Sequence, residues 1–199
     1  MIDGGHLRVV VRKAGLRYDP DYIESLALAC ALPDEEVYRI FYYDCPPFIG
    51  EVKLPVSGTK THLSGRDGWL RTLAAKQLFA VRLGVLKFRG FKPKKIPISE
   101  RPLLDGDFYP DFEQKGVDMR IGLDIATFCK TRAVKRVVLI TNDTDCIPAM
   151  KFGRREGLQV ALVSFPNQNP APDLLHHADF HRRVENWPEQ QNADNHHLS

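Results

Sequence analysis

The chain has 199 residues, of which 43% are hydrophobic and 27% are charged, so it is long enough to form one domain with a buried core. No apolar run approaches the ~20 residues that a membrane helix needs, and the first residues lack the basic and apolar regions of a signal peptide. We therefore expect a cytoplasmic protein that makes no membrane contact. The net charge of +3 is too small to indicate a partner by itself.

The four cysteines do not form a recognisable framework. Cys30, Cys45, Cys129 and Cys146 contain no C-x-x-C pair, and Cys30 and Cys129 lie in apolar helical runs. We therefore expect reduced cysteines, mostly buried, and neither a disulfide framework nor a cysteine zinc site.

The pattern of apolar residues predicts alternating strands and helices. In the first part of the chain, we expect a short strand at residues 1–3, helices at 6–14 and 20–31, a strand at 36–44 and a loop at 45–65. In the middle, we expect a helix at 67–83, a strand at 84–91, a loop at 92–112 and a helix at 113–132. In the last part, we expect a strand at 136–141, a helix from 145 or 146 to 157, a strand at 159–164, a short helix at 172–178 and an edge strand at 180–184. The first strand is either very short or begins upstream of Met1. This alternation predicts an α/β domain with a mainly parallel sheet over residues 1–185. Residues 186–199 are expected to form a polar, disordered tail.

Acidic residues follow two of the predicted strands directly. Asp3 ends the first strand, and Asp143 and Asp145 follow the strand at 136–141. In open α/β sheets, ligands bind beyond the carboxyl ends of strands. Asp118 lies near the start of a helix whose inner face is apolar. Each aspartate alone could be a helix cap or a turn residue, but the repetition at two strand ends favours one shared site.

Several carboxylates that converge without a lysine among them repel one another unless they hold a hard cation. Mg²⁺ and Mn²⁺ prefer such oxygen ligands and retain bound water. A metal ion in this setting activates water for attack on a phosphoryl group. Basic residues that suit a phosphate backbone cluster between residues 66 and 115: Arg66, Lys87, Arg89, Lys92, Lys94, Lys95 and Lys115. For any single basic cluster, an ordinary solvated surface is the simpler reading.

Three short motifs resemble those of a known family. I-D-G-G-H-L at 2–7, Q-K-G-V-D-M at 114–119 and T-N-D-T-D-C at 141–146 resemble the motifs of the NYN domain, in the LabA-like branch of the PIN-like nucleases. The resemblance covers roughly residues 1–165. It implies a three-layer α/β/α fold with strand order 3-2-1-4-5 and a metal-dependent ribonuclease activity. By position, it implies that Asp3, Asp118, Asp143 and Asp145 are the catalytic, metal-binding acids.

The chain departs from the usual motifs at three positions. His6 stands where the family usually has Asn, and Asn142 and Cys146 stand where Gly and Phe are usual. We therefore treat His6 and Asn142 as accessory site residues. Asp124 is also an accessory candidate, although its spacing favours a structural pair with Arg120, four residues earlier.

Other functions remain open alongside a ribonuclease that cuts RNA endonucleolytically with Mg²⁺ or Mn²⁺. One is a non-catalytic RNA-binding module of the same fold, and another is a metal-dependent phosphatase or DNA nuclease. A haloacid-dehalogenase-type phosphatase is disfavoured because Gly5 stands where a second acid would be needed. Glycine-rich phosphate loops are absent, and His176, His177 and His181 read more simply as surface residues than as a zinc site. A homodimer through exposed edge strands is a further open possibility.

Overall fold

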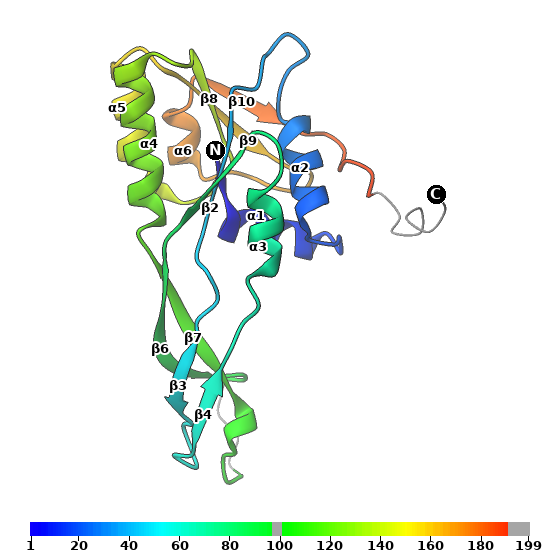
Figure 1. Ribbon diagram of the computed structural model, residues 1–199, viewed down its shortest axis with the longest axis vertical. Helices are drawn as coiled ribbons and strands as arrows, with labels where there is room; N and C mark the ends of the chain where they lie inside the picture. The colour runs from blue at the N-terminus through cyan, green and yellow to red at the C-terminus, as the bar shows by residue number, and fades with distance from the viewer. Residues whose placement is uncertain (97–100, 191–199) are drawn as a thin grey trace.

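Two three-stranded parallel sheets form the centre of the protein. The computed structural model describes residues 1–96 and 101–190. Strands β1 (Ile2–Asp3), β2 (Ile40–Asp44) and β5 (Phe79–Leu83) pair in the order β1-β2-β5. Strands β8 (Arg136–Leu139), β9 (Gln159–Ser164) and β10 (Phe180–Arg183) pair in the order β10-β9-β8. A parallel bridge between Ile2 and Ile140 joins β1 to the end of β8, so the two sheets run on into each other (Figure 1).

Helices cover both faces of these strands. One core cluster joins the strands to α1 (Gly4–Lys13), α2 (Pro20–Ala29) and α3 (Gly68–Ala74), and a second joins them to α4 (Val117–Thr131), α5 (Ile147–Arg155) and α6 (Pro172–His176). Strand β2 shows why two clusters form. Its residues alternate between them, with Ile40 and Tyr42 in the first and Phe41 and Tyr43 in the second. The predicted α/β class with parallel strands is therefore confirmed.

Local signals set several helix ends as the sequence predicts. The side chain of Asp19 accepts a hydrogen bond from the backbone N–H of Tyr22 at 2.9 Å, and Pro20 occupies the first helical position of α2. Helix α4 ends where Arg132 adopts the left-handed conformation, with φ of 51°. Strand β9 spans the residues that its apolar run predicts.

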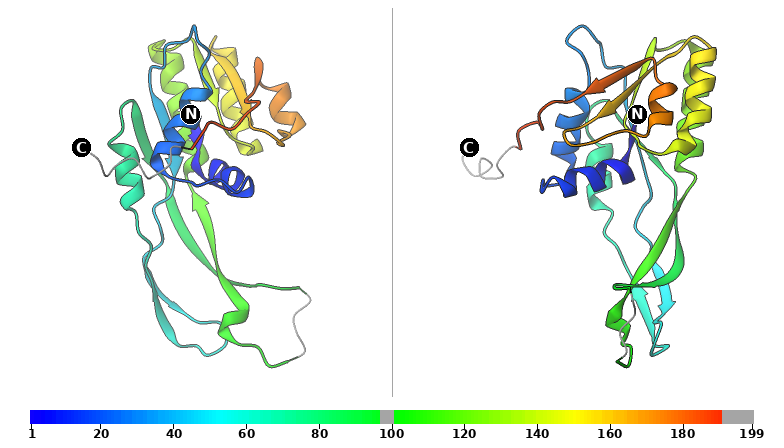
Figure 2. Two further views of the ribbon diagram at one scale, coloured as in Figure 1. Left: turned by 90° about the vertical axis from the view of Figure 1, so that its right-hand side faces the viewer. Right: turned by 180° about the vertical axis from the view of Figure 1, so that it is seen from behind.

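Two antiparallel hairpins project from the domain (Figures 1 and 2). Strand β3 (Gly50–Lys53) pairs with β4 (Lys60–Leu63), and the long β6 (Val85–Pro93) pairs with β7 (Phe108–Lys115). We call these four strands the arm. A short 3-10 helix, η1 (Asp105–Asp107), precedes β7. The first hairpin of the arm follows β2 and leads into α3, and the second follows β5 and leads into α4, so the root of the arm lies at the carboxyl edge of the parallel strands.

Phenylalanine side chains hold the arm together. Phe88 lies 5.8 Å from Phe48, 5.3 Å from Phe91 and 5.8 Å from Phe112, measured between ring centroids. Phe88 and Phe91 are three residues apart and would normally face opposite sides of a strand. A register shift at Gly90, which has φ of 110°, brings both to the same side. The predicted alternation of this strand is present, but the face expected to be buried is only half-buried, because β6 projects from the domain and its phenylalanines pack against the arm alone.

Several predicted boundaries are wrong, and the arm accounts for most of the errors. The predicted loops at 45–65 and 92–112 contain β3, β4 and the start of β7, and the predicted helix at 113–132 begins only at Val117. The predicted helix at 67–83 ends at Ala74, and the chain then turns through Leu78, which has a positive φ of 66°, into β5. The predicted strand at 36–44 begins only at Ile40. Strands as short as β3 and β4, with four residues each, leave little periodicity in the sequence.

The beginning of the expected tail is packed against the domain. Trp187 stacks on Phe165 with ring centroids 5.2 Å apart and the ring planes 8° from parallel. The side chain of Gln190 donates to the carbonyl of Arg17 at 2.9 Å. The rest of the expected tail, residues 191–199, lies outside the described residues.

The cysteines and the lengths of the helices also bear on the sequence predictions. The four cysteines are free, and three of them are buried, as expected. Within the described ranges, no helix has the length and apolar character needed to cross a membrane.

Candidate metal centre

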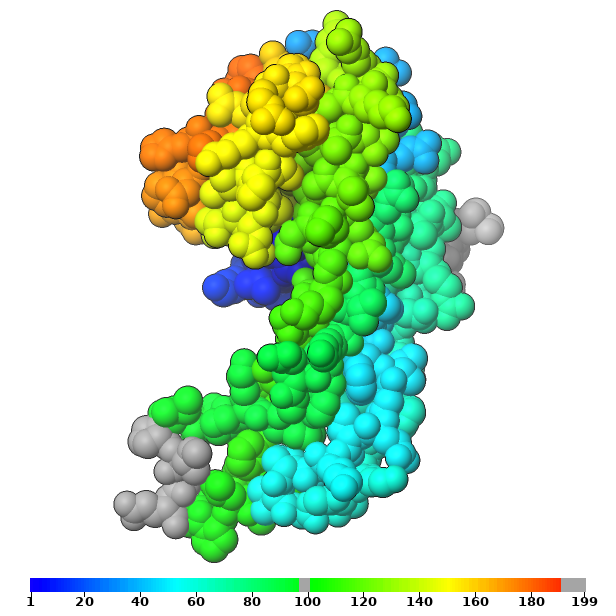
Figure 3. Space-filling model, turned by 90° about the vertical axis from the view of Figure 1, so that its left-hand side faces the viewer, coloured from blue at the N-terminus to red at the C-terminus, as the bar shows by residue number. Residues whose placement is uncertain are grey.

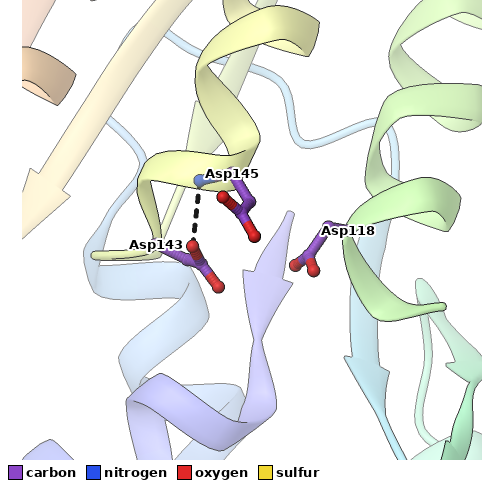
Figure 4. Close-up of side chains that lie close together, drawn as sticks. All are labelled: Asp118, Asp143 and Asp145. Carbon is purple, nitrogen blue, oxygen red and sulfur yellow. Dashed lines mark hydrogen bonds between the residues drawn. The ribbon is translucent and has the colours of Figure 1, made fainter. Parts of the chain in front are cut away.

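Three aspartates gather where the end of β8 meets the first turn of α4. Asp118 lies in the first turn of α4, Asp143 follows β8, and Asp145 lies in the 3-10 helix η2 (Thr144–Cys146). Each offers a carboxylate oxygen, and these oxygens all lie within 4.8 Å of one another (Figure 4). The carboxylate of Asp143 accepts a hydrogen bond from the backbone N–H of Asp145 at 2.9 Å, which fixes the turn between them. We call these three residues the acidic cluster.

Asp3 lies beside the acidic cluster and is almost fully buried. One of its oxygens caps α1 by accepting from the backbone N–H of His6 at 3.0 Å, and the other accepts from the hydroxyl of Thr141 at 3.1 Å. The same hydroxyl oxygen accepts from the backbone N–H of Asp143 at 3.1 Å. Asp3 is therefore tied to the acidic cluster through Thr141, although it is not one of the three carboxylates that converge.

These charges have no basic side chain paired with them in the part of the chain that the structure describes. Within residues 1–96 and 101–190, none of the ion pairs involves Asp3 or the acidic cluster. Burial raises the pKa of Asp118, and the negative charges of Asp143, Asp3 and Asp145 raise it further. A carboxyl group held in this way favours either a proton or a cation.

The donor set fits a hard divalent cation. Carboxylate oxygens from Asp118, Asp143 and Asp145 are the ligands that Mg²⁺ and Mn²⁺ prefer, and the exposed positions of Asp143 and Asp145 leave room for bound water. By contrast, His176, His177 and His181 do not belong to the cluster of metal-ligating groups found in the described chain. His181 instead shares a hydrogen bond with the hydroxyl of Ser164 at 2.8 Å.

A further strand-end acid, Asp44, was missed in the sequence. It ends β2, next to the β1 residue Asp3, and its side chain is fully buried. Asp44 forms an ion pair with Arg8 and accepts from the hydroxyl of Tyr42 at 3.1 Å and the backbone N–H of Cys45 at 2.8 Å. Burial raises the pKa of Asp44, and the charge of Arg8 opposes this rise. Its position at the end of the apolar run at 36–44 was the available signal.

The accessory candidates have different roles in the structure. Burial lowers the pKa of His6, against the opposing charge of Asp3, so its imidazole is mainly neutral at pH 7. The side-chain oxygen of Asn142 accepts from the backbone N–H of Ala171 at 2.9 Å. The expected pair between Asp124 and Arg120 is wrong. Asp124 accepts instead from the hydroxyl of Tyr43 at 2.9 Å and ion-pairs with Arg82 at 3.2 Å, because it faces β2 and β5.

The basic candidates lie on or next to the arm. Lys92 pairs with Asp111 at 2.9 Å and Arg89 with Glu113 at 3.4 Å, both across the β6–β7 ribbon. Lys115 pairs with Glu113 within β7. Lys115 is the last residue of β7, just before the helix that carries Asp118. The side chains that remain exposed on this part of the molecule include Arg66, Lys87, Lys94 and Lys95.

Comparison with known proteins identifies one family. The NYN domain family matches residues 71–184, which is more than half of the chain. The match includes the acidic cluster and excludes the first motif at 2–7. No curated protein matches the chain. Among solved structures, the chain is similar to a protein of unknown function from Vibrio parahaemolyticus RIMD 2210633, with 16% identity, 89% of this chain and 85% of that chain covered, and a TM-score of 0.46.

The ion pair beneath the site predicts a pH-dependent loss of stability in Arg8→Met. This substitution keeps an apolar stem but leaves the buried carboxylate of Asp44 without its cation, so we expect the free energy of unfolding at pH 7 to fall by about 3–5 kcal/mol. The pKa of Asp44 is already raised and rises further without Arg8. The loss should therefore be smaller at pH 4 than at pH 7, because protonation removes the buried charge as the pH falls through that pKa.

Urea denaturation at pH 4 and pH 7 measures this effect. Arg12→Met, at an exposed position on the same helix, is the matched control and should change stability by less than about 0.5 kcal/mol. An equal loss for Arg8→Met at both pH values would contradict the assignment of Asp44 as its buried partner.

Proposed function

The chain belongs to the NYN domain family, and on that basis we propose that it is a Mg²⁺- or Mn²⁺-dependent ribonuclease of the LabA-like branch. NYN domains are nuclease-like domains of PIN-like type. The observation that carries the proposal is the uncompensated acidic cluster at the carboxyl edge of the strands. Hydrolysis at such a centre needs no serine or histidine nucleophile, because the water is activated directly.

We assign distinct tasks to the acids. Asp118, Asp143 and Asp145 would hold the divalent cation, with Asp3 as a fourth acid that positions Thr141 and the turn before Asp143. A cation bound there lowers the pKa of its water and polarises a phosphoryl oxygen of RNA. His6 and Asn142 act as accessory residues that shape the wall beside the centre, whereas Asp124 has a structural role on α4.

The strand arrangement supports the PIN-like part of the proposal. If the bridge between Ile2 and Ile140 is counted as a pairing, the parallel strands lie in the order β5-β2-β1-β8-β9-β10. Without the arm strands, β1, β2, β5, β8 and β9 are the first five strands of the chain, so their order in the sheet is 3-2-1-4-5, with β10 added beside β9. We propose this as the fold's sheet order. Both outer strands have a free edge in the described chain, and a homodimer through such an edge is retained as a proposal, as is a cytoplasmic location.

The arm is proposed to hold RNA on its way to the acidic cluster. It begins and ends at the edge where the cluster lies, and the molecule is concave between α1 and the outer part of the arm (Figure 3). Exposed Lys87, Lys94 and Lys95 lie on β6 or directly after it. Arg66, Arg89, Lys92 and Lys115 add positive charge, although the last three also pair with acids of β7. Positive charge placed along a projecting ribbon suits the phosphates of a single strand.

Cleavage of labelled single-stranded RNA with Mn²⁺, Mg²⁺ or EDTA tests the nuclease. We expect metal-dependent cutting that falls by more than about 100-fold in Asp118→Asn and Asp143→Asn, because each substitution removes a charged ligand. Asp124→Asn makes the same change six residues along the same helix, away from the cluster, and should keep most of the activity.

Each alternative function gives a different result in this assay. RNA binding without cutting under every condition would contradict the nuclease and favour a binding module. Turnover of DNA or of small phosphate esters without RNA cleavage would favour a DNA nuclease or a phosphatase.

Salt dependence of RNA binding tests the arm. The triple substitution of Lys87, Lys94 and Lys95 by Ala should weaken binding and reduce the slope of log K against log salt by about 0.7 for each phosphate that the variant no longer neutralises. Fluorescence anisotropy in EDTA measures this without cleavage. Substituting Lys130, Arg132 and Lys135 by Ala removes the same charge near the opposite edge of the strands and should leave the slope nearly unchanged. Equal effects of the two triple variants would contradict a specific role for the arm.

A further inference from the structure

We propose that a pocket beside the acidic cluster binds one nucleobase of the RNA and selects for bases that carry carbonyl acceptors. The proposal deepens the proposed function and rests on it. The pocket has a volume of about 400 Å³ and lies between α1, the turn after β8 and the segment that follows β9. Among its lining residues are His6, Lys13, Asn142, Gln168 and Trp187.

The pocket is directly connected to the metal centre. Thr141 lines the pocket, donates its hydroxyl to Asp3 and accepts from the backbone N–H of Asp143. The next residue, Asn142, also lines the pocket and directly precedes Asp143. A base held there would therefore place the adjoining backbone phosphate next to the acidic cluster, with the exposed amine of Lys13 at the rim for another phosphate.

The aromatic wall has a fixed orientation. Trp187 lines the pocket and is half-buried, and its ring lies parallel to Phe165 at a centroid distance of 5.2 Å. Pro166 and Pro170 add apolar surface. Unpaired RNA bases are commonly recognised by stacking on aromatic side chains together with hydrogen bonds to their edges. The volume lies within the range of small-ligand sites, and a single base enters such a pocket only from an unpaired strand.

Four amide side chains line the pocket, those of Asn142, Asn167, Gln168 and Asn169, and backbone donors fix the orientation of two of them. The side-chain oxygen of Gln168 accepts from the backbone N–H of Phe165 at 3.2 Å, and that of Asn142 accepts from the backbone N–H of Ala171. Because each oxygen is used by a backbone donor, the amino group is the end of each side chain left to meet a ligand. Amino groups donate to the carbonyl oxygens of uracil, guanine and cytosine, whereas adenine has no carbonyl oxygen and offers only ring nitrogens as acceptors.

Nucleoside binding, monitored by NMR in the presence of EDTA, tests whether the pocket binds a base without requiring cleavage. The chain has two tryptophans, Trp69 and Trp187, so the indole N–H signal of Trp187 is assigned by its loss in Trp187→Phe. We expect uridine to shift the Trp187 signal and leave Trp69 unchanged, and adenosine at the same concentration to cause a smaller shift. Gln168→Glu keeps the oxygen that meets Phe165 but replaces the amino donor. It should weaken uridine binding by at least about tenfold.

Gln159→Glu is the matched control, because it makes the same change on β9 at the end away from the pocket, where Gln159 contacts Arg136. It should bind uridine as the unmodified protein does. In the RNA assay, Gln168→Glu should reduce cutting beside a single uridine placed in an oligoadenosine strand.

The outcomes separate this inference from the nuclease proposal. Metal-dependent RNA cleavage with no effect of uridine on Trp187, or with uridine binding unchanged by Gln168→Glu, would overturn the base pocket and leave the nuclease intact. Uridine binding that depends on Gln168 in a protein that cuts no RNA would support the pocket and contradict the nuclease.

Discussion

Two backbone hydrogen bonds at β1 hold the functional edge of this protein together. The N–H of Asp3 donates to the carbonyl of Ile140 at 2.9 Å, and the N–H of Ile140 donates to the carbonyl of Met1 at 3.0 Å. They place β1 between β2 and the end of β8, so that two separate parallel sheets share one carboxyl edge. Asp3, Asp44 and Asp143 come to that edge only because the pairing is parallel on both sides.

The acids at this edge differ in whether a basic side chain neutralises their charge. Asp44 is fully buried and paired with Arg8, whose guanidinium also lies 5.7 Å from the ring centroid of Tyr18. Asp118, Asp143 and Asp145 have no such partner among the described residues, and their mutual repulsion raises the pKa of Asp118 beyond the effect of burial. The first arrangement stabilises the base of the site with an internal cation, whereas the second leaves negative charge that an external cation can neutralise.

The sequence predicted most of the domain because its signals there are local. Asp19 and Pro20 indicate the start of α2, and the apolar run of β9 has the length and flanking residues of a buried strand. The convergence of Asp118 with Asp143 and Asp145 was predicted from strand ends and from the family resemblance. Of the arm, only β6 was predicted, as a strand at 84–91. Strands β3, β4 and most of β7 were assigned to loops, because β3 and β4 are short and the prolines and glycines around these strands resemble those of a loop. Asp44 was missed because its ion pair joins residues 36 positions apart, and the pocket beside the centre depends on Trp187, which was assigned to the tail.

Thermal unfolding during titration with Mn²⁺ tests the central claim most directly. We predict that the melting temperature of the unmodified protein rises with Mn²⁺ concentration, because an ion that binds only the folded state stabilises it. Without metal, Asp118→Asn should have a higher melting temperature than the unmodified protein, because it relieves repulsion among the carboxylates. Mn²⁺ should raise the melting temperature of Asp118→Asn only slightly. Asp124→Asn should show the same rise with Mn²⁺ as the unmodified protein. A melting temperature indifferent to Mn²⁺, or a response that survives in Asp118→Asn, would contradict a metal centre at this edge.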